Sequence, residues 1–216
     1  MQRTHTQRSI KCLIDNEMSP VVGRQPVRSH KEDREEALVR AAFNQIAERG
    51  FEGLRTREVA AGVGLNIATL HYYFPTKEAL IRGVVAHAMD RFRSTLAPHG
   101  SPADQLRNHL RAVRKLLRDE PEVGAVMGEL ALRSARDPAM ARIMGEAFQA
   151  WQRTLRGLLQ RAAGDGYLAG DLDYDDVAAL IMATLTSMTL PSTASADRTD
   201  RAFRQLERWL GLRPSK

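Results

Sequence analysis

The fold of this chain is decided by the stretch RTREVAAGVGLNIATLHYYFPTKEAL, which runs from Arg55 to Leu80. Gly64 lies between two short segments with helical spacing, and Pro75 separates the second segment from a third that begins at Lys77. Glycine readily adopts the left-handed turn that joins two helices, and proline does not continue a helix. The stretch therefore predicts a helix-turn-helix followed at once by a further helix.

Polar residues at the helix starts support these boundaries. Thr56 is a suitable N-cap for the first helix, which ends at Gly64. Asn66 is expected to cap the second helix, which runs to Phe74, and Thr76 is expected to cap the third. Each of the three helices thus has its own start signal.

The rest of the chain also has helical spacing. Apolar residues recur every three or four positions over 33–49, and Pro102, Pro121 and Pro138 each lie where a first helical turn tolerates a missing amide hydrogen. No run alternates polar and apolar residues over the length of a strand, so we expect an all-α fold with about nine helices. Besides 33–49 and the helix-turn-helix, the expected helices cover 77–96, 102–118, 121–135, 138–164, 174–190 and 198–211.

The composition excludes several classes of protein. The 216 residues, 43% of them hydrophobic, can bury a sizeable core, but the longest apolar runs are far shorter than the roughly 20 residues that cross a bilayer. Cys12 is the single cysteine, and the six histidines lack the paired spacing of a metal site. No G-x-S-x-G motif occurs. We therefore expect a soluble cytoplasmic protein without membrane partner, metal, cofactor or enzymatic activity.

The basic charge lies mainly on the leading arm. Residues 1–31 carry six Lys or Arg against two acids, residues 32–95 carry nine of each, and residues 96–216 carry seventeen against fifteen. We expect residues 1–30 to be disordered. Such an arm could follow phosphates or enter a minor groove, and it could equally be a solvated tail. A start at Met18 would shorten it.

The second helix of the motif divides into two faces. A helical wheel places Ile67, Leu70 and Phe74 together on a core face. At the start of the first helix, Thr56 and Arg57 together with free backbone amides suit a phosphate, and the alternative is a plain cap with a solvated arginine. The face of the second helix that would meet the major groove carries Ala68, Thr69, Tyr72 and Tyr73.

An ordered set of residues matches a family pattern, namely Gly50, Phe51, Thr56, Val59, Ala60, Gly64, Thr69, Leu70, Tyr73, Phe74 and Lys77. On these positions the stretch from Glu35 to Phe92 resembles the TetR family of bacterial transcriptional regulators. The resemblance implies an all-helical fold that, after the basic arm over 1–30, has a DNA-binding domain over 31–76 and a ligand-binding and dimerisation domain over 77–216.

The resemblance also implies which side chains contact DNA. It implies phosphate contacts from Thr56, His71, Tyr73 and Lys77, and base-edge contacts from the first turn of the second helix. Arg57 would make either contact. The full set of expected DNA-binding residues is Thr56, Arg57, Asn66, Ile67, Ala68, Thr69, His71, Tyr72, Tyr73 and Lys77.

At four of these positions, Ile67, Ala68, His71 and Tyr72, the contact with the DNA bases has more than one interpretation. Ile67 and Ala68 stand where the family usually has a polar reader followed by glycine or proline. Ile67 either touches a thymine methyl or is buried in the core. The helical wheel favours Tyr72 as the residue that faces DNA, whereas the resemblance favours His71.

In the family the last two helices form a four-helix interface with a second copy, so the resemblance implies a homodimer. Two DNA-binding domains about 34 to 36 Å apart, one from each copy, would reach successive major grooves of a palindromic operator. The alternative is that these helices pack within one chain. The expected interface residues are Val177, Leu180, Ile181, Phe203, Leu206, Trp209 and Leu210.

The C-terminal body is also where the resemblance places a small-molecule effector. Thioether and aromatic side chains suit an apolar or aromatic compound, and Trp151 offers it one polar group. The same side chains would equally suit an ordinary core. The expected ligand-binding residues are Met127, Leu130, Met144, Phe148, Trp151, Met182, Leu185 and Met188.

Two functions from different classes remain. The first is a homodimeric transcriptional regulator, a repressor that a small, largely apolar ligand releases from a palindromic operator. The second is a helical small-molecule-binding protein or enzyme with a vestigial DNA-binding head. Specific binding to a palindrome that weakens steeply with salt distinguishes the first from the second.

Overall fold

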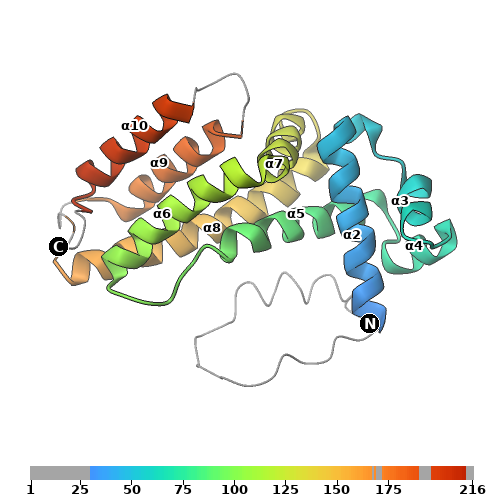
Figure 1. Cartoon of the computed structure of the whole chain (residues 1–216), viewed down its shortest axis with the longest axis horizontal. Coiled ribbons are helices and arrows are strands. Elements are labelled where there is room, and N and C mark those ends of the chain that lie inside the picture. The colour runs from blue at the N-terminus through green and yellow to red at the C-terminus, as the bar shows by residue number, and fades with distance from the viewer. Residues whose placement is uncertain (1–29, 167, 169–171, 190–195, 213–216) are drawn as a thin grey trace. The chain divides into compact units, whose positions relative to one another are not determined.

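The computed structural model describes residues 30–166, 168, 172–189 and 196–212. In these ranges the chain forms nine α-helices and one 3-10 helix and has no strand, which confirms the all-α prediction (Figure 1). Apart from His30, the predicted arm lies outside the described residues. The elements are α2 (His30–Arg49), η1 (Phe51–Gly53), α3 (Thr56–Gly62), α4 (Ile67–Tyr73), α5 (Lys77–Arg93), α6 (Pro102–Asp119), α7 (Pro121–Ser134), α8 (Pro138–Gly164), α9 (Tyr174–Ser187) and α10 (Ala196–Trp209).

Most helix ends lie within a few residues of the predicted ones, and the early end of α5 has a local cause. α5, expected to reach Leu96, ends at Arg93. The N–H groups of Thr95 and Leu96 bond to carbonyls three residues back, at 3.2 and 2.9 Å, so the last turn tightens and the α-helix stops. Leu190, the expected end of α9, lies outside the described residues.

The chain divides into two compact units, the first ending at His87 and the second beginning at Ala88. In the first unit α3 packs on α2 and α4 packs on α3 (Figure 1). Gly83 of α5 lies so close to α2 that an added Cβ would be 2.8 Å from Cγ2 of Val39. The core of this unit contains Leu38, Phe43, Ile46, Leu70, Phe74, Leu80 and Val84.

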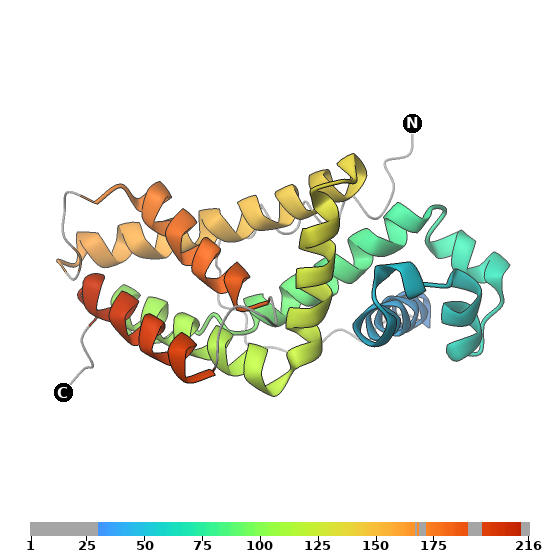
Figure 2. The same cartoon turned by 90° about the horizontal axis from the view of Figure 1, so that it is seen from above.

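The second unit is organised around α8, the longest helix. α6, α7 and α9 all pack against it (Figure 2). Its buried side chains include Met140, Ile143, Trp151 and Leu158. The core of this unit contains Leu110, Val126, Leu130, Met144, Leu155, Leu159 and Ile181.

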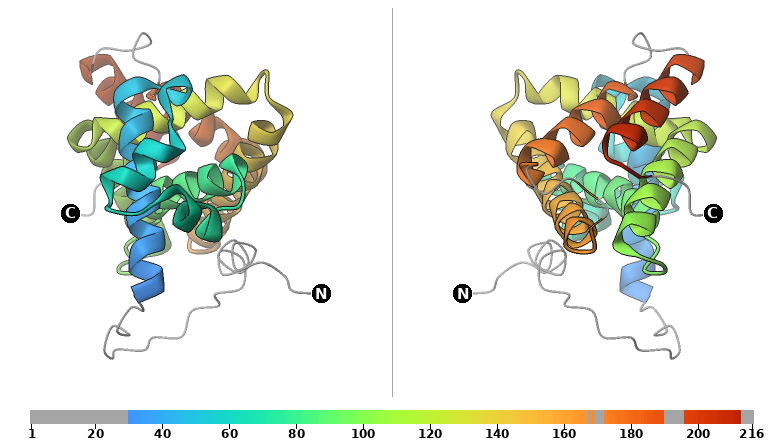
Figure 3. Two further views of the ribbon diagram at one scale, coloured as in Figure 1. Left: turned by 90° about the vertical axis from the view of Figure 1, so that its right-hand side faces the viewer. Right: turned by 90° about the vertical axis from the view of Figure 1, so that its left-hand side faces the viewer.

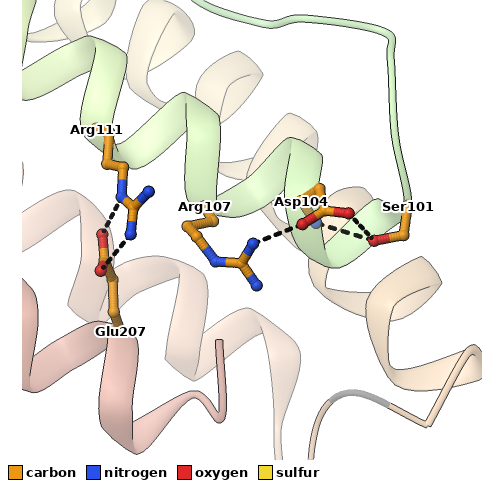
Figure 4. Close-up of polar contacts among 5 residues, drawn as sticks. All are labelled: Ser101, Asp104, Arg107, Arg111 and Glu207. Atoms are coloured by element: carbon orange, nitrogen blue, oxygen red, sulfur yellow. Dashed lines mark hydrogen bonds and ion pairs between the residues drawn. The ribbon is translucent and has the colours of Figure 1, made fainter. Parts of the chain in front are cut away.

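α10 is held on α6 by both apolar and ionic contacts. Phe203 is fully buried, and the guanidinium of Arg114 lies 5.1 Å from its ring centroid. Arg114 also pairs with Asp200, and Arg111 Nε donates to Glu207 Oε1 at 3.3 Å (Figure 4). These contacts leave the other face of α10 uncovered beside α9 (Figure 3, right).

The start of α6 shows how the prolines and caps work together. Ser101 Oγ accepts a hydrogen bond from the N–H of Asp104 at 3.2 Å, and Pro102 follows as the first helical residue (Figure 4). Hydrogen bonds from Ser101 and from Arg107 keep the pKa of Asp104 below its ordinary value. The predicted start of this helix is confirmed.

Candidate nucleic-acid interface

The first helix of the motif, α3, is positioned by two polar side chains of α2. The N–H of Arg55, just before α3, donates to Oε1 of Gln45 at 2.6 Å. Arg49 Nη1 donates to Oε2 of Glu58 at 2.7 Å, and Nε2 of Gln45 donates to the same oxygen at 3.3 Å. α2 therefore fixes both the start and the first turn of α3 (Figure 3, left).

The prediction that Thr56 caps α3 is wrong. Thr56 is the first helical residue, and Arg55, with an extended backbone, stands at the cap position without a side-chain cap bond. The reason is the bond from the N–H of Arg55 to Gln45, which fixes the backbone one residue earlier than the sequence suggests. The Thr56 hydroxyl makes no hydrogen bond to any described residue, so it is not used for capping.

The turn between α3 and α4 has the predicted glycine geometry. Gly64 has a φ of 70°, in the left-handed region that glycine adopts without strain. The N–H of Leu65 bonds back to the carbonyl of Ala60 at 2.9 Å and closes the end of α3. This turn sets the direction in which α4 leaves.

Asn66 caps α4 as predicted. The cap also determines which groups of Asn66 and Thr69 donate and which accept hydrogen bonds. Its Oδ1 accepts from the backbone N–H of Thr69 at 2.8 Å. The same oxygen lies 3.1 Å from Thr69 Oγ1, and since that oxygen can only accept, the hydroxyl must donate. The Asn66 amide nitrogen keeps its two donors, and the Thr69 oxygen keeps only its acceptor capacity.

The two faces of α4 are divided largely as predicted. Leu70 is buried, as is Phe74 just after the helix, whereas Ile67 is half-buried. Thr69 and Tyr73 on the opposite face are partly exposed. His71 and Tyr72, the two candidates for the side chain that faces DNA, are both exposed, and so is Ala68 in the first turn of α4.

Tyr72 and Lys77 have aromatic neighbours. Tyr72 is 71% exposed, its ring meets that of Tyr73 edge to face at 5.3 Å, and Nζ of Lys31 lies 5.7 Å from its centroid. Nζ of Lys77, at the exposed start of α5, lies 4.4 Å from the ring centroid of Phe51. Such contacts steady a lysine while its charge remains in solvent. The sequence gives no local sign of either pair.

Two family models together account for most of the chain. Residues 38–84 match the model for bacterial regulatory proteins of the tetR family, and residues 96–205, about half of the chain, match the model for a tetracyclin repressor-like C-terminal domain. This chain belongs to the TetR family of transcriptional regulators. The first match covers the helix-turn-helix, and the second covers α6 to α9 and most of α10.

Two curated proteins are similar to part of this chain. Nucleoid occlusion factor SlmA of Pasteurella multocida is 30% identical over 120 residues, which cover 54% of this chain and 60% of that protein. The regulator RutR of Escherichia coli is 29% identical over 96 residues, 41% of this chain and 43% of that one. The chain thus spans about half the length of the curated relatives it matches.

Solved structures share the whole fold. A TetR-family regulator from a Rhodococcus species superposes with a TM-score of 0.75 at 22% identity, over 83% of this chain and 99% of that one. At this identity the likeness establishes the fold alone.

The second unit of this TetR-family chain contains a cavity with room for about one water-sized sphere, a volume of about 10 Å³. Four of the expected ligand-binding residues line it, namely Met127, Phe148, Trp151 and Leu185. Leu130, Met144 and Met182 are buried but do not line it, and Met188 is half-buried outside it. The residues that the sequence did not indicate are Phe92, Leu117, Thr186 and Thr189.

Trp151 does not offer the cavity a free polar group, contrary to expectation. Its Nε1–H donates to Nε2 of the fully buried His109 at 3.1 Å. A neutral histidine then carries its proton on Nδ1, which lies 2.7 Å from Thr95 Oγ1. The Thr95 hydroxyl in turn donates to the carbonyl of Phe92 at 2.6 Å. Every polar hydrogen in this chain of bonds has an acceptor.

The residues expected at a dimer interface fall into two groups. Leu180 on α9 is 52% exposed and Trp209 at the end of α10 is 71% exposed, while Val177 is half-buried. The others are buried within the chain and stabilise the two helices from inside; these are Ile181, Phe203, Leu206 and Leu210.

The part of the chain that the structure describes has neither a membrane-spanning helix nor a cluster of metal ligands. No helix there has both the length and the apolar content to cross a membrane. No three side chains of His, Cys, Asp or Glu in the same ranges gather where a metal ion could bind.

Proposed function

We propose that this chain acts as a homodimeric repressor that binds a palindromic operator and is released from it by a small, largely apolar ligand. The observation that carries the proposal is the exposed face of α4, held by the Asn66 cap at the end of a glycine turn. In a helix-turn-helix this face enters the major groove. Membership of the TetR family supports the same role.

The geometry divides the proposed DNA contacts into two kinds. Phosphates are held by the unbonded hydroxyl of Thr56, by the exposed Arg57 and Lys77, and by His71 and Tyr73. Base edges are contacted by the first turn of α4 and by Tyr72, with Ile67 and Ala68 offering apolar contact to a thymine methyl. The first-turn residues with polar groups are Asn66 and Thr69.

A homodimer provides the second half of the operator contact. The exposed Leu180 and Trp209 lie on α9 and α10, and large apolar side chains left in solvent favour burial against a partner. A two-fold axis between identical copies would bury both side chains twice. Two heads then bind two half-sites of one palindrome.

The experiment is a titration of the purified chain with the DNA upstream of its own gene, against random DNA of equal length. We expect nanomolar binding to one palindrome and an affinity that falls at least a thousandfold, by order of magnitude, between about 50 and 200 mM salt, because several phosphates lose their counterions on binding. Equal affinity for both DNAs would contradict the proposal. If a metabolite is bound or converted by the chain in spite of substitutions at Thr56 and Lys77, the chain is instead a helical binder or enzyme.

A further inference from the structure

One face of α2 carries the side chains that hold the helix-turn-helix. Gln45 and Arg49 on this face bind the start and the first turn of α3. The buried Leu38 lies seven residues before Gln45, and Lys31 lies seven residues before Leu38. Residues seven apart project from nearly the same side of an α-helix. Lys31 therefore projects from the side of α2 on which α3 and α4 lie (Figure 1).

Lys31 meets an aromatic ring of α4. Its Nζ lies 5.7 Å from the ring centroid of Tyr72, within the distance at which an ammonium group is attracted to the face of a ring. The Tyr72 ring is itself held edge to face by that of Tyr73 and is 71% exposed. A lysine from the start of α2 thus has its charged group beside the helix that is proposed to enter the major groove.

The charge of Lys31 is not used within the described part of the chain. No carboxylate of the described residues forms an ion pair with it, whereas Arg49 on the same face pairs with Glu58 at 2.7 Å. Glu32 and Asp33 follow it in the first turn but project from other sides of the helix. An aromatic ring attracts an ammonium group without neutralising it, so the exposed Lys31 keeps its full charge and its N–H donors for another partner.

A cation at this place lies where the DNA backbone would run. An α-helix with its side chains is about 10–12 Å across and fills the major groove, which is about 12 Å wide. A cation held against the side of such a helix therefore lies at the edge of the groove, beside the phosphates. Residues 32–95 carry as many acids as bases, so the attraction of this unit for phosphates depends on cations that no acid pairs with. Lys31 precedes residues 38–84, which match the family model, so family membership assigns it no role.

We propose that Lys31 binds a phosphate at the edge of the major groove, and that the ring of Tyr72 positions its ammonium group there. This rests on the proposed binding of α4 in the groove. It adds a side chain of α2 to the DNA contacts. It also gives Tyr72 a positioning role that its ring performs while its hydroxyl group remains available for a base edge.

The test measures how the affinity of the full chain for DNA depends on salt, with the DNA upstream of its own gene and with random DNA. Each phosphate contact adds about 0.9 to the slope of log affinity against log salt, so Lys31→Met in both copies of a dimer should lower the slope by about 1.8. Between about 50 and 200 mM salt the wild type should then lose about ten times more affinity than the variant. The effect should be the same on both DNAs, because a phosphate contact does not depend on sequence.

The matched control is Arg40→Met. Arg40 is an exposed cation of the same helix, but it lies nine residues after Lys31 and therefore on the opposite face. Its substitution should leave the slope unchanged. An unchanged slope in Lys31→Met, an equal decrease in Arg40→Met, or a decrease confined to the upstream DNA would overturn the phosphate contact.

Two substitutions at Tyr72 test the positioning role. Tyr72→Leu removes the ring but no charge, and we expect it to lower the slope toward that of Lys31→Met. Tyr72→Phe keeps the ring and should keep the slope, so equal slopes in these two variants would overturn the positioning role. Equal wild-type affinity for the two DNAs would instead refute the proposed repressor, while the slope on either DNA still tests Lys31. A chain that binds neither DNA would refute both.

Discussion

His109 is a buried side chain whose protonation state determines the polar contacts around the cavity. Its Nε2 accepts the Trp151 hydrogen only while the ring is neutral, because a protonated histidine has no acceptor. Burial lowers its pKa to about 4. The bond between α6 and α8 is therefore intact throughout the physiological pH range.

The first prediction is a pH dependence of stability. The unfolded histidine takes up a proton below about pH 6.5, whereas the folded one does so only below about 4. The stabilisation is thus complete above pH 6.5 and is lost as the pH falls from 6.5 to 4, about 3 kcal/mol in all. Urea unfolding at pH 7, 6 and 5 measures it. His109→Gln, which keeps an acceptor but does not titrate, should show a shallower slope, and an equal slope would contradict the low pKa.

The second prediction concerns the hydroxyl group of Thr69 and its effect on operator binding. Its hydroxyl proton is committed to Asn66, so the oxygen can accept only from an amino group of adenine or cytosine in the major groove. We expect Thr69→Val to weaken operator binding about tenfold and to lose the preference at one base pair, with little change in melting temperature. Binding to operators substituted at each position checks this. Asn66→Ala should in contrast cost about 1 kcal/mol of stability, because the cap is lost.

At the scale of elements, the close approach of Thr189, just after α9, to α7 is sensitive to side-chain size. Gly128→Ala would place a methyl group 2.6 Å from the Thr189 carbonyl, and we expect a loss of about 1 to 3 kcal/mol in the free energy of unfolding. Gly145→Ala on α8 is the control, since an added Cβ there meets nothing within 4 Å, and it should raise stability by up to about 1 kcal/mol. Denaturant unfolding of both variants measures the two changes in the free energy of unfolding. Equal changes would mean that the close approach at Gly128 is absent.

Local signals in the sequence were enough to predict most of the elements. The left-handed turn at Gly64 and the cap at Asn66 depend on residues that lie within a few positions of each other. The cap of α3 was predicted wrongly because Gln45, ten residues away, holds the backbone of Arg55. No short-range pattern reports such a contact.

The same contrast between local and long-range contacts applies to the candidate site. The exposed face of α4 could be predicted from helical periodicity, whereas the lining of the cavity depends on how five helices pack. Trp151 was expected to offer a free donor, but its partner His109 is 42 residues away in the sequence. Thr186 and Thr189 also line the cavity, and a Cβ added to Gly128 of α7 would lie 2.6 Å from the Thr189 carbonyl oxygen, a close approach that the sequence of α9 alone does not show.

At the scale of the whole molecule, the proposed dimer depends on two exposed apolar side chains. We expect the double substitution Leu180→Glu and Trp209→Glu to give a monomer, because four buried carboxylates would repel across the two-fold axis. Operator binding should fall by at least about a hundredfold, while the helix content stays the same. Sedimentation velocity and DNA titration measure the two effects.

A matched control separates this effect from a general loss of solubility. Leu132 on α7 is 62% exposed and lies on a different helix from the proposed interface. Leu132→Glu should therefore leave the oligomeric state and operator affinity unchanged. A dimer that survives the double substitution would place the interface elsewhere.

The difference in burial between two side chains that line the cavity has a practical consequence for redesign. On α7 the lining side chain is the buried Met127, so shortening it would leave a void in the core. On α8, the half-buried Phe148 can be shortened to leucine or alanine at a smaller cost than a fully buried ring, which gives room for a ring or a longer alkyl chain. A library at this one position would retune the chain into a reporter for bulkier inducers without altering the operator that it recognises.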